Sequence, residues 1–176
     1  MKIFAAILLC LSLCLSLWGC GLADREPAAD TTAISAPTEQ TAASAEQQLT
    51  SFQTLTADSI RALDIVYVRP ENGGTRVYKT FTETSDVQAV LDILKDANLQ
   101  TAENQEPQGG WTLLVRIWSS MQSGESAEPL LISSGGDTSI RIGSYAYTAK
   151  SAAYYTDLLA FFETPAAEEK PYTVSS

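Results

Sequence analysis

The sequence predicts an α+β domain in which an antiparallel sheet carries two helices on one face, forming a two-layer sandwich. Three observations favour this fold. Segments that alternate like strands outnumber those with helical spacing, turn residues separate most of the strands, and only two segments of the predicted domain place apolar residues on one helical face. Short turns join antiparallel neighbours, and helices cover the buried face of such a sheet. The expected order of elements is ββαββββα.

The first half of the domain is predicted to be a hairpin followed by a helix. Residues 63–68 and 76–81 alternate as strands, and the Pro, Asn and Gly residues between them supply turn chemistry. Ser85 and Gln88 have the spacing of a capping box, and the apolar residues after them share one helical face. A helix is therefore expected over residues 86–97.

The second half is predicted to contain four strands and a closing helix. Residues 111–118 are strongly apolar and β-branched, which favours a central strand. Gly143 suits a tight hairpin turn, although a bulge within one long strand is also compatible with it. The predicted elements of this half are strands at residues 111–118, 130–132, 139–142 and 145–148 and a helix that begins near Ser151.

The composition argues against several kinds of site. The formal net charge is -10, which disfavours nucleic acid and anionic lipid headgroups as partners. Histidine is absent, and with it the commonest general base and a common zinc ligand. The three cysteines, Cys10, Cys14 and Cys20, all lie near the N-terminus, so the predicted domain contains no thiol. We therefore expect no metal, no other cofactor and no enzymatic activity.

The N-terminus has the pattern of an export signal that ends in a lipid attachment site. Lys2 precedes an apolar run typical of a signal peptide. The run ends in Leu17-Trp18-Gly19-Cys20, which resembles the lipobox of bacterial lipoprotein precursors through its Leu, its Gly and its Cys, although Trp18 is bulkier than usual. The resemblance implies cleavage between Gly19 and Cys20, a diacylglyceryl thioether on Cys20, and acylation of the new amino group with a fatty acid such as palmitate.

Two alternatives to this anchor stay open. The apolar run is also compatible with a permanent transmembrane helix, although it is shorter than the roughly 20 residues that a bilayer requires. Gly21-Leu22-Ala23 also offers small residues at the spacing that an ordinary signal peptidase reads, and cleavage there would release a soluble protein.

The composition divides the chain into four parts. The segment after Cys20 is rich in Ala, Thr, Glu, Gln, Ser and Pro and lacks aromatic residues. It is therefore not expected to bury enough apolar surface to compensate for the conformational entropy that it would lose on folding. The expected division is a signal peptide at 1–19, a lipidated cysteine and disordered acidic linker at 20–49, a small globular domain at 50–163, and a disordered tail at 164–176.

The overall layout is similar to that of small lipoproteins of the Firmicutes type. The likeness lies in the lipobox, the acidic linker, a hairpin, a capped helix and a late Ile-x-Ile-Gly-x-Tyr hairpin, here Ile140–Tyr145. It implies a place on the extracytoplasmic side of the cell membrane and no particular activity.

Acidic residues that resemble ligand sets are better explained as structural. Asp86, Asp92 and Asp96 fall mainly on the solvated flank of the predicted helix, and Asp86 suits the helix start. Glu103 and Glu106 lie in a loop, without the spacing that glycoside hydrolysis requires. Two further acidic groups lack the ligand spacing of a calcium loop and are interpreted as turns, Glu71-Asn72-Gly73 and Gly135-Gly136-Asp137.

The serines give no support for a serine hydrolase. Ser133-Ser134-Gly135 and Ser144 have no histidine partner, and neither lies in a Gly-x-Ser-x-Gly elbow.

The candidate binding surface is on the strand at residues 111–118. Alternation places Arg116 and Trp118 on the same face, opposite Val115 and Ile117. If helices cover the face that carries Val115 and Ile117, then Arg116 and Trp118 point outward. They would then offer a platform for a sugar, a peptide or a protein. The alternative is that Trp118 packs against a loop or the second helix.

The expected function is that of a non-enzymatic binding or sensing module at the cell envelope, joined to the membrane through the lipid on Cys20. Its expected partner is an envelope protein, a peptide or a glycan. Two alternatives stay open. The first is a hydrolase of glycan or cell-wall material that works with carboxylates alone, and the second is a secreted inhibitor or a structural envelope protein.

Overall fold

The computed structural model describes residues 39–106, 109–120 and 128–173 of the chain. The predicted signal peptide, the lipobox with Gly19 and Cys20, and the first part of the predicted linker lie outside the described residues. Within the described ranges, no helix is both long enough and apolar enough to cross a membrane.

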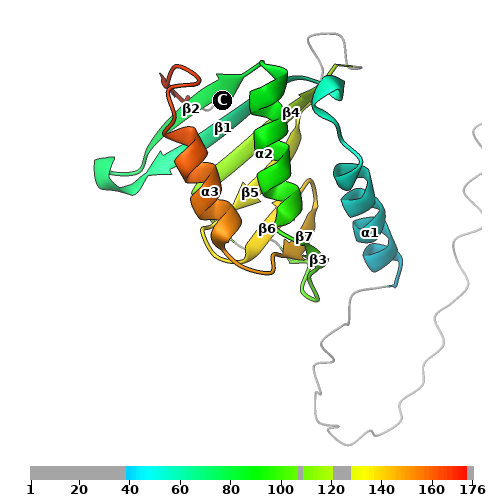
Figure 1. Cartoon of the computed structure of the whole chain (residues 1–176). Helices are drawn as coiled ribbons and strands as arrows, with labels where there is room; N and C mark the ends of the chain where they lie inside the picture. The colour runs from blue at the N-terminus through cyan, green and yellow to red at the C-terminus, as the bar shows by residue number, and fades with distance from the viewer. Residues whose placement is uncertain (1–38, 107–108, 121–127, 174–176) are drawn as a thin grey trace, which may run out of the picture. The chain divides into compact units, whose positions relative to one another are not determined.

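The strands of the described residues form one antiparallel sheet in the order β3-β7-β6-β5-β4-β1-β2-β8 (Figure 1). The prediction of an α+β fold with an antiparallel sheet is confirmed. The strands are β1 (Ile60–Arg69), β2 (Thr75–Phe81), β3 (Gln100–Thr101), β4 (Leu113–Ser119), β5 (Leu130–Ser134), β6 (Ser139–Ile142), β7 (Tyr145–Thr148) and β8 (Lys170–Pro171).

Three helices accompany the sheet in the described part of the chain: α1 (Glu39–Gln53), α2 (Thr84–Asp96) and α3 (Ala153–Phe162). In Figure 1, α2 and α3 run side by side in front of the strands. The predicted capping box is wrong, because Glu83 is the N-cap residue of α2 and Ser85 lies within the first turn. Gln88 instead donates a hydrogen bond to Asp92 at 2.7 Å.

The main core forms where alternate residues of the central strands meet apolar residues of the helices. The central strands β1, β4, β5 and β6 bury alternate side chains on this side, as the pleat requires. Burial of such side chains stabilises the fold by about 1.5–3 kcal/mol each. Fully buried members include Leu63, Ile65 and Val115 from the strands, Val90 and Leu94 from α2, and Leu158 and Phe162 from α3.

The turn between β6 and β7 is a two-residue hairpin, as one of the two interpretations of Gly143 predicts. Gly143 has φ of 57° and begins the turn between the paired residues Ile142 and Tyr145. A positive φ at this position favours glycine. The turn therefore separates two short strands, and the alternative of a bulge in one long strand is wrong.

The folded region starts earlier than residue 50. Residues 39–49, assigned to the disordered linker from their composition, form most of α1. Ala45 and Phe52 on this helix are buried, and the hydroxyl of Tyr147 on β7 donates a hydrogen bond to the Ala45 carbonyl at 2.7 Å. Burial raises the pKa of Tyr147 to about 12, so this hydroxyl keeps its proton at neutral pH. Ala, Glu and Gln favour helix, but packing on the sheet gives this helix its buried face.

The segment predicted as a disordered tail also includes ordered structure. The two residues of β8 pair with Val77 and Tyr78 of β2. Arg69 binds Glu169 at 2.6 Å and Glu163 at 3.1 Å, which joins the end of β1 to the segment that leads into β8. The folded region therefore extends past residue 163, the expected boundary.

We predict that Tyr147→Phe lowers the free energy of unfolding by about 1 kcal/mol, because it removes a buried hydrogen bond between β7 and α1. Urea unfolding followed by far-ultraviolet circular dichroism measures the change. Tyr145→Phe, on the same strand, is the matched control, since the Tyr145 hydroxyl makes no hydrogen bond within the described residues. Equal effects of the two substitutions would contradict the docking of α1.

Candidate functional site

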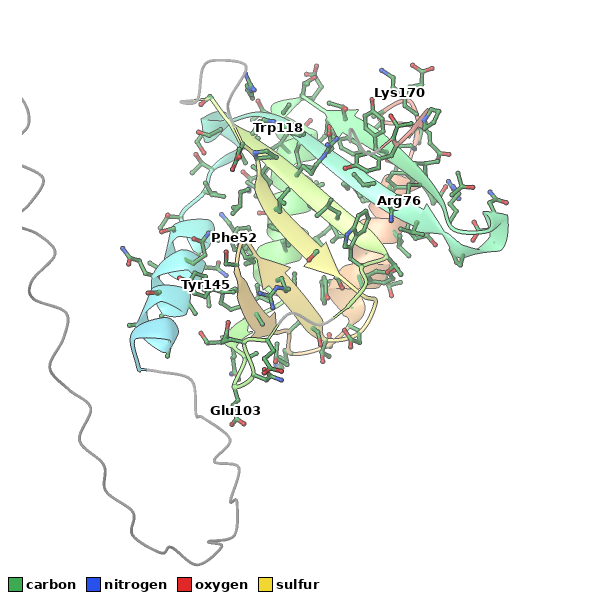
Figure 2. The ribbon with its side chains drawn as sticks, turned by 180° about the vertical axis from the view of Figure 1, so that it is seen from behind. Phe52, Arg76, Glu103, Trp118, Tyr145 and Lys170 are labelled. Atoms are coloured by element: carbon green, nitrogen blue, oxygen red, sulfur yellow. The ribbon has the colours of Figure 1, made fainter. Side chains whose placement is uncertain are left out.

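The candidate site lies on the face of the sheet whose side chains do not join the main core. This outer face carries the second set of alternating residues from the central strands. Figure 2, the view from behind, shows β4 and β5 in front of the helices and labels Arg76, Trp118 and Lys170. We define the outer face by Asp64 and Val66 on β1, Tyr78 on β2, Leu114, Arg116 and Trp118 on β4, and Leu131 on β5.

An ion pair between Arg116 and Asp64 forms the centre of the outer face. The two residues are direct partners across β1 and β4, and Arg116 Nη2 donates a hydrogen bond to Asp64 Oδ2. Asp64 is only 4% exposed, and its other oxygen accepts a hydrogen bond from the Thr80 hydroxyl at 2.7 Å. A buried carboxylate with these partners holds the guanidinium in one position.

Three aromatic rings surround the Arg116 guanidinium. The ring centroids of Trp118 and Tyr172 each lie 5.0 Å from it, and that of Tyr78 lies 5.9 Å away. Tyr78 and Tyr172 also meet edge to face, with centroids 6.1 Å apart. Arginine stacks well on aromatic faces, so the four side chains form one packed unit. We call Arg116, Trp118, Tyr78 and Tyr172 the arginine cluster.

The structure brings together the two residues that the sequence analysis selected. Arg116 and Trp118 lie on the same face of β4, as predicted, and both are half-buried. Trp118 packs on the guanidinium of Arg116, so part of its ring is covered by its neighbour on the strand. The platform is therefore a composite surface and not a single exposed indole ring.

The surroundings of the arginine cluster are apolar and cationic. Leu131 pairs with Arg116 across β4 and β5 and is 43% exposed. Lys170 pairs with Tyr78 on the other side, and Arg76 lies over the Trp111 ring at 5.4 Å. Within the described residues, neither Arg76 nor Lys170 forms an ion pair. These cations contrast with the acidic composition of the whole chain.

A pocket of about 610 Å³ is lined by β3, β5, β6, β7 and the loop between β3 and β4. Trp111 and Arg141 contribute to its lining, together with Glu103 and Asp137. Both carboxylates are exposed to solvent. Glu103, interpreted from the sequence as a loop charge, and Asp137, interpreted as part of a turn, thus line the same pocket.

The remaining candidates have structural roles or lie on the surface. Asp92 and Asp96 are exposed on α2, and no group of three acidic residues in the described parts of the chain is arranged to hold a metal ion. Ser134 is buried, and its hydroxyl lies 2.6 Å from that of Tyr154 in α3. Burial raises the pKa of Tyr154, so its hydroxyl is suited to hydrogen bonding and not to proton abstraction.

The two acidic groups interpreted as turns are confirmed as turns. Residues 70–72 form a short 3-10 turn followed by Gly73, whose φ is 67°. Gly136 has φ of 102°, and an added Cβ would approach the Tyr155 ring to 3.3 Å. Glycine is required at these positions by the backbone conformation.

Sequence reasoning missed three members of the site. Asp64 lies in β1 on the same face as Val66. The alternation of the strand does not show that Arg116 lies opposite Asp64 on the neighbouring strand. Tyr172 follows β8 in the segment predicted as a tail, and the aromatic and β-branched run Tyr172-Thr173-Val174 is a sequence signal for extended structure there. Tyr78 was identified only as a strand residue. No protein family, curated protein or solved structure matches this chain.

Proposed function

We propose that this chain is a lipid-anchored extracytoplasmic protein that binds an envelope protein through the outer face of its sheet. The observation that carries the proposal is the arginine cluster, an arginine held by a buried carboxylate and surrounded by two tyrosines and a tryptophan. Arg, Trp and Tyr are the residues most enriched among those that dominate binding energy at protein interfaces.

We infer that α2 and α3 form the second layer of a two-layer sandwich and leave the outer face free of helices. Support comes from the buried residues of both helices, which join the main core with Leu63, Ile65 and Val115 of the sheet. Val66 and Leu114, on the other side of the same strands, do not belong to that core. Val66 and Leu114 are themselves buried, so the area open to a partner is formed by the half-buried Arg116 and Trp118 and the exposed Leu131.

The rigidity of the arginine cluster favours binding. Arg116 is already oriented by Asp64 and by stacking with Trp118, so little side-chain entropy remains to be lost in a complex. Leu131 offers an exposed apolar contact directly beside it. The arrangement combines an apolar contact with fixed aromatic anchors, as the centre of a protein interface does.

The charge of the outer face indicates an acidic segment on the partner. Arg76 and Lys170 have no ion-pair partner within the described residues, while the chain as a whole carries a charge of -10. A cationic region on an acidic protein steers and orients a partner of opposite charge and repels other cations. The partner is therefore expected to present carboxylates near an aliphatic or aromatic contact.

The proposed anchor is the lipid on Cys20. It is supported by the resemblance of Leu17-Trp18-Gly19-Cys20 to a lipobox. Anionic headgroups add little to the membrane affinity of an acidic protein. Two acyl chains hold a protein stably at a bilayer, whereas a single chain gives only marginal binding.

Photo-crosslinking in cells tests the binding surface. A photoreactive residue at position 131 is expected to give a discrete protein adduct that the same residue at position 157 does not give, since Asp157 is exposed on α3. Arg76→Glu should lower the adduct yield roughly tenfold or more, because like charges at an interface cost several kcal/mol. Lys150→Glu makes the same charge change at an exposed residue and should leave the yield unchanged.

Two results would overturn the proposed surface. The first is the same adduct from positions 131 and 157. The second is an adduct from position 131 whose yield is the same in Arg76→Glu and in Lys150→Glu, because the cations of the outer face would then play no part.

A further inference from the structure

The pocket next to the outer face is a second candidate site on this domain. It adjoins the proposed protein interface, because Arg76, one of the cations assigned to that interface, lies over the ring of Trp111, which lines the pocket. Its volume of about 610 Å³ falls within the roughly 300–1,000 Å³ of typical small-molecule sites. Its lining comes from four strands, from the turn between β5 and β6, and from residues 102–104 and 109–111, so segments distant in sequence converge on it.

Residues 102–106, in and next to the wall of the pocket, are held in place by side-chain hydrogen bonds. The Gln105 amide nitrogen donates to the carbonyls of Ala102 at 2.7 Å and Ala146 at 3.0 Å, and its oxygen accepts from the Ala146 N–H at 2.9 Å. Arg141 donates to the Glu106 carbonyl at 3.3 Å. Both contacts fasten the loop to β6 and β7. A wall fixed in this way lowers the entropy lost on binding.

The lining combines two aromatic residues with many uncharged polar groups; Tyr147 is buried and its hydroxyl is bonded to the Ala45 carbonyl, so Trp111 is the more accessible ring. Trp111 is half-buried at the side of the pocket, and hydroxyl groups and side-chain amides make up much of the remainder. Such a set suits a ligand with an apolar ring face and several hydroxyl groups, because the indole stacks on the ring and the amides bind the hydroxyls. The residues with uncharged hydroxyl or amide side chains, apart from the buried Ser134 and Tyr147, are Gln100, Thr101, Asn104, Ser133, Ser139 and Thr148.

The charges of the pocket disfavour an anionic ligand. Arg141 is its one basic lining residue, and its guanidinium is already engaged by the backbone carbonyls of Glu106 and Ser144. Glu103 and Asp137 are exposed in the same lining and repel anions. A ligand without charge avoids this repulsion and still finds acceptors in both carboxylates.

From these observations we propose that the pocket binds a short stretch of an uncharged polysaccharide, with Trp111 as its stacking platform. The ligand differs in class from the acidic protein partner proposed for the arginine cluster. The two sites use different tryptophans, Trp111 and Trp118, and they adjoin where Arg76 lies over the Trp111 ring at 5.4 Å. Substitution of Trp118 therefore leaves the aromatic ring of the pocket in place.

The test uses the mature full chain in detergent micelles, titrated with maltohexaose and with chitohexaose as uncharged probes and with poly-γ-glutamate as an anionic probe. One of the two oligosaccharides is expected to bind, as measured by calorimetry and by a change in tryptophan fluorescence. Trp111→Ala should raise its Kd about tenfold or more through the loss of stacking. Trp118→Ala is the matched control and should leave the Kd unchanged, with Trp111 still reporting by fluorescence.

Trp111→Phe guards against a folding defect, because it keeps a ring and should retain part of the affinity. The proposal is overturned if neither oligosaccharide binds at millimolar concentration, if poly-γ-glutamate binds more tightly than both, or if Trp118→Ala weakens binding as much as Trp111→Ala. None of these results bears on the crosslinks from position 131, so the failure of this site is distinguishable from failure of the protein interface.

Discussion

Asp64→Ala is expected to lower the free energy of unfolding by about 3–5 kcal/mol, because it leaves the Arg116 guanidinium without its counter-charge in a partly buried site. Arg116 Nε is already buried without a hydrogen-bond partner among the described residues, so the arginine has few alternatives when the carboxylate is removed. The Thr80 hydroxyl loses its acceptor as well. Urea unfolding followed by tryptophan fluorescence measures the loss, with Trp118 as a reporter in direct contact with Arg116.

A second variant distinguishes loss of the ion pair from general damage to the sheet. Asp64→Ala combined with Arg116→Met removes both charges and keeps an apolar side chain beneath the aromatic rings. Replacement of a buried ion pair by apolar residues is often neutral, so the double variant should recover most of the stability. A loss below about 1 kcal/mol in Asp64→Ala would instead show that the pair behaves like an exposed surface ion pair.

Cys20→Ser is expected to abolish lipid attachment and to move the protein out of the membrane fraction. The substitution removes the only sulfur at which the lipobox resemblance places a lipid. Since each buried methylene contributes about 0.8 kcal/mol, loss of the acyl chains removes most of the affinity for the bilayer. Metabolic labelling with an alkyne fatty acid, combined with mass spectrometry of the N-terminal peptide, measures the result.

Cys14→Ser is the matched control for the anchor. Cys14 lies in the apolar run that the proposed cleavage would remove, so the labelled mature protein should be unaffected by its substitution. The lipid anchor is ruled out if the wild-type protein carries an unmodified thiol at Cys20 or begins at Asp24. The second result would identify Gly21-Leu22-Ala23 as the site of an ordinary signal peptidase.

The strands that sequence patterns predicted are those whose signal is local. The strands β1, β2, β4, β5, β6 and β7 each alternate or carry a β-branched run, and each lies within a few residues of its predicted position. The pattern is readable because the pleat itself places alternate residues on opposite faces. The two-residue strands β3 and β8 are too short for any periodicity, and only their partners β7 and β2 define them.

Helix α1 shows the limit of composition as a guide to order. Its apolar positions are few, and the stretch rich in Ala, Glu and Gln is as compatible with a disordered linker as with a helix. Phe52 and Ala45 become buried only because the domain offers a surface to cover them. Isolated helices of this length are marginal in water, so the tertiary contact is decisive.

The sequence by itself determined the class of fold, the acidic character of the chain, the absence of histidine, and the shared face of Arg116 and Trp118. Only the tertiary structure decided that Asp64 lies opposite Arg116 and that the Tyr172 ring packs on Arg116. It also decided that residues of four strands and a loop line one pocket. The reason is that periodicity depends on neighbours along the chain, whereas these contacts join residues far apart in sequence. The choice of which strands become neighbours in the sheet, and the path of the loops between them, bring such residues together, and the periodicity of a single segment encodes neither.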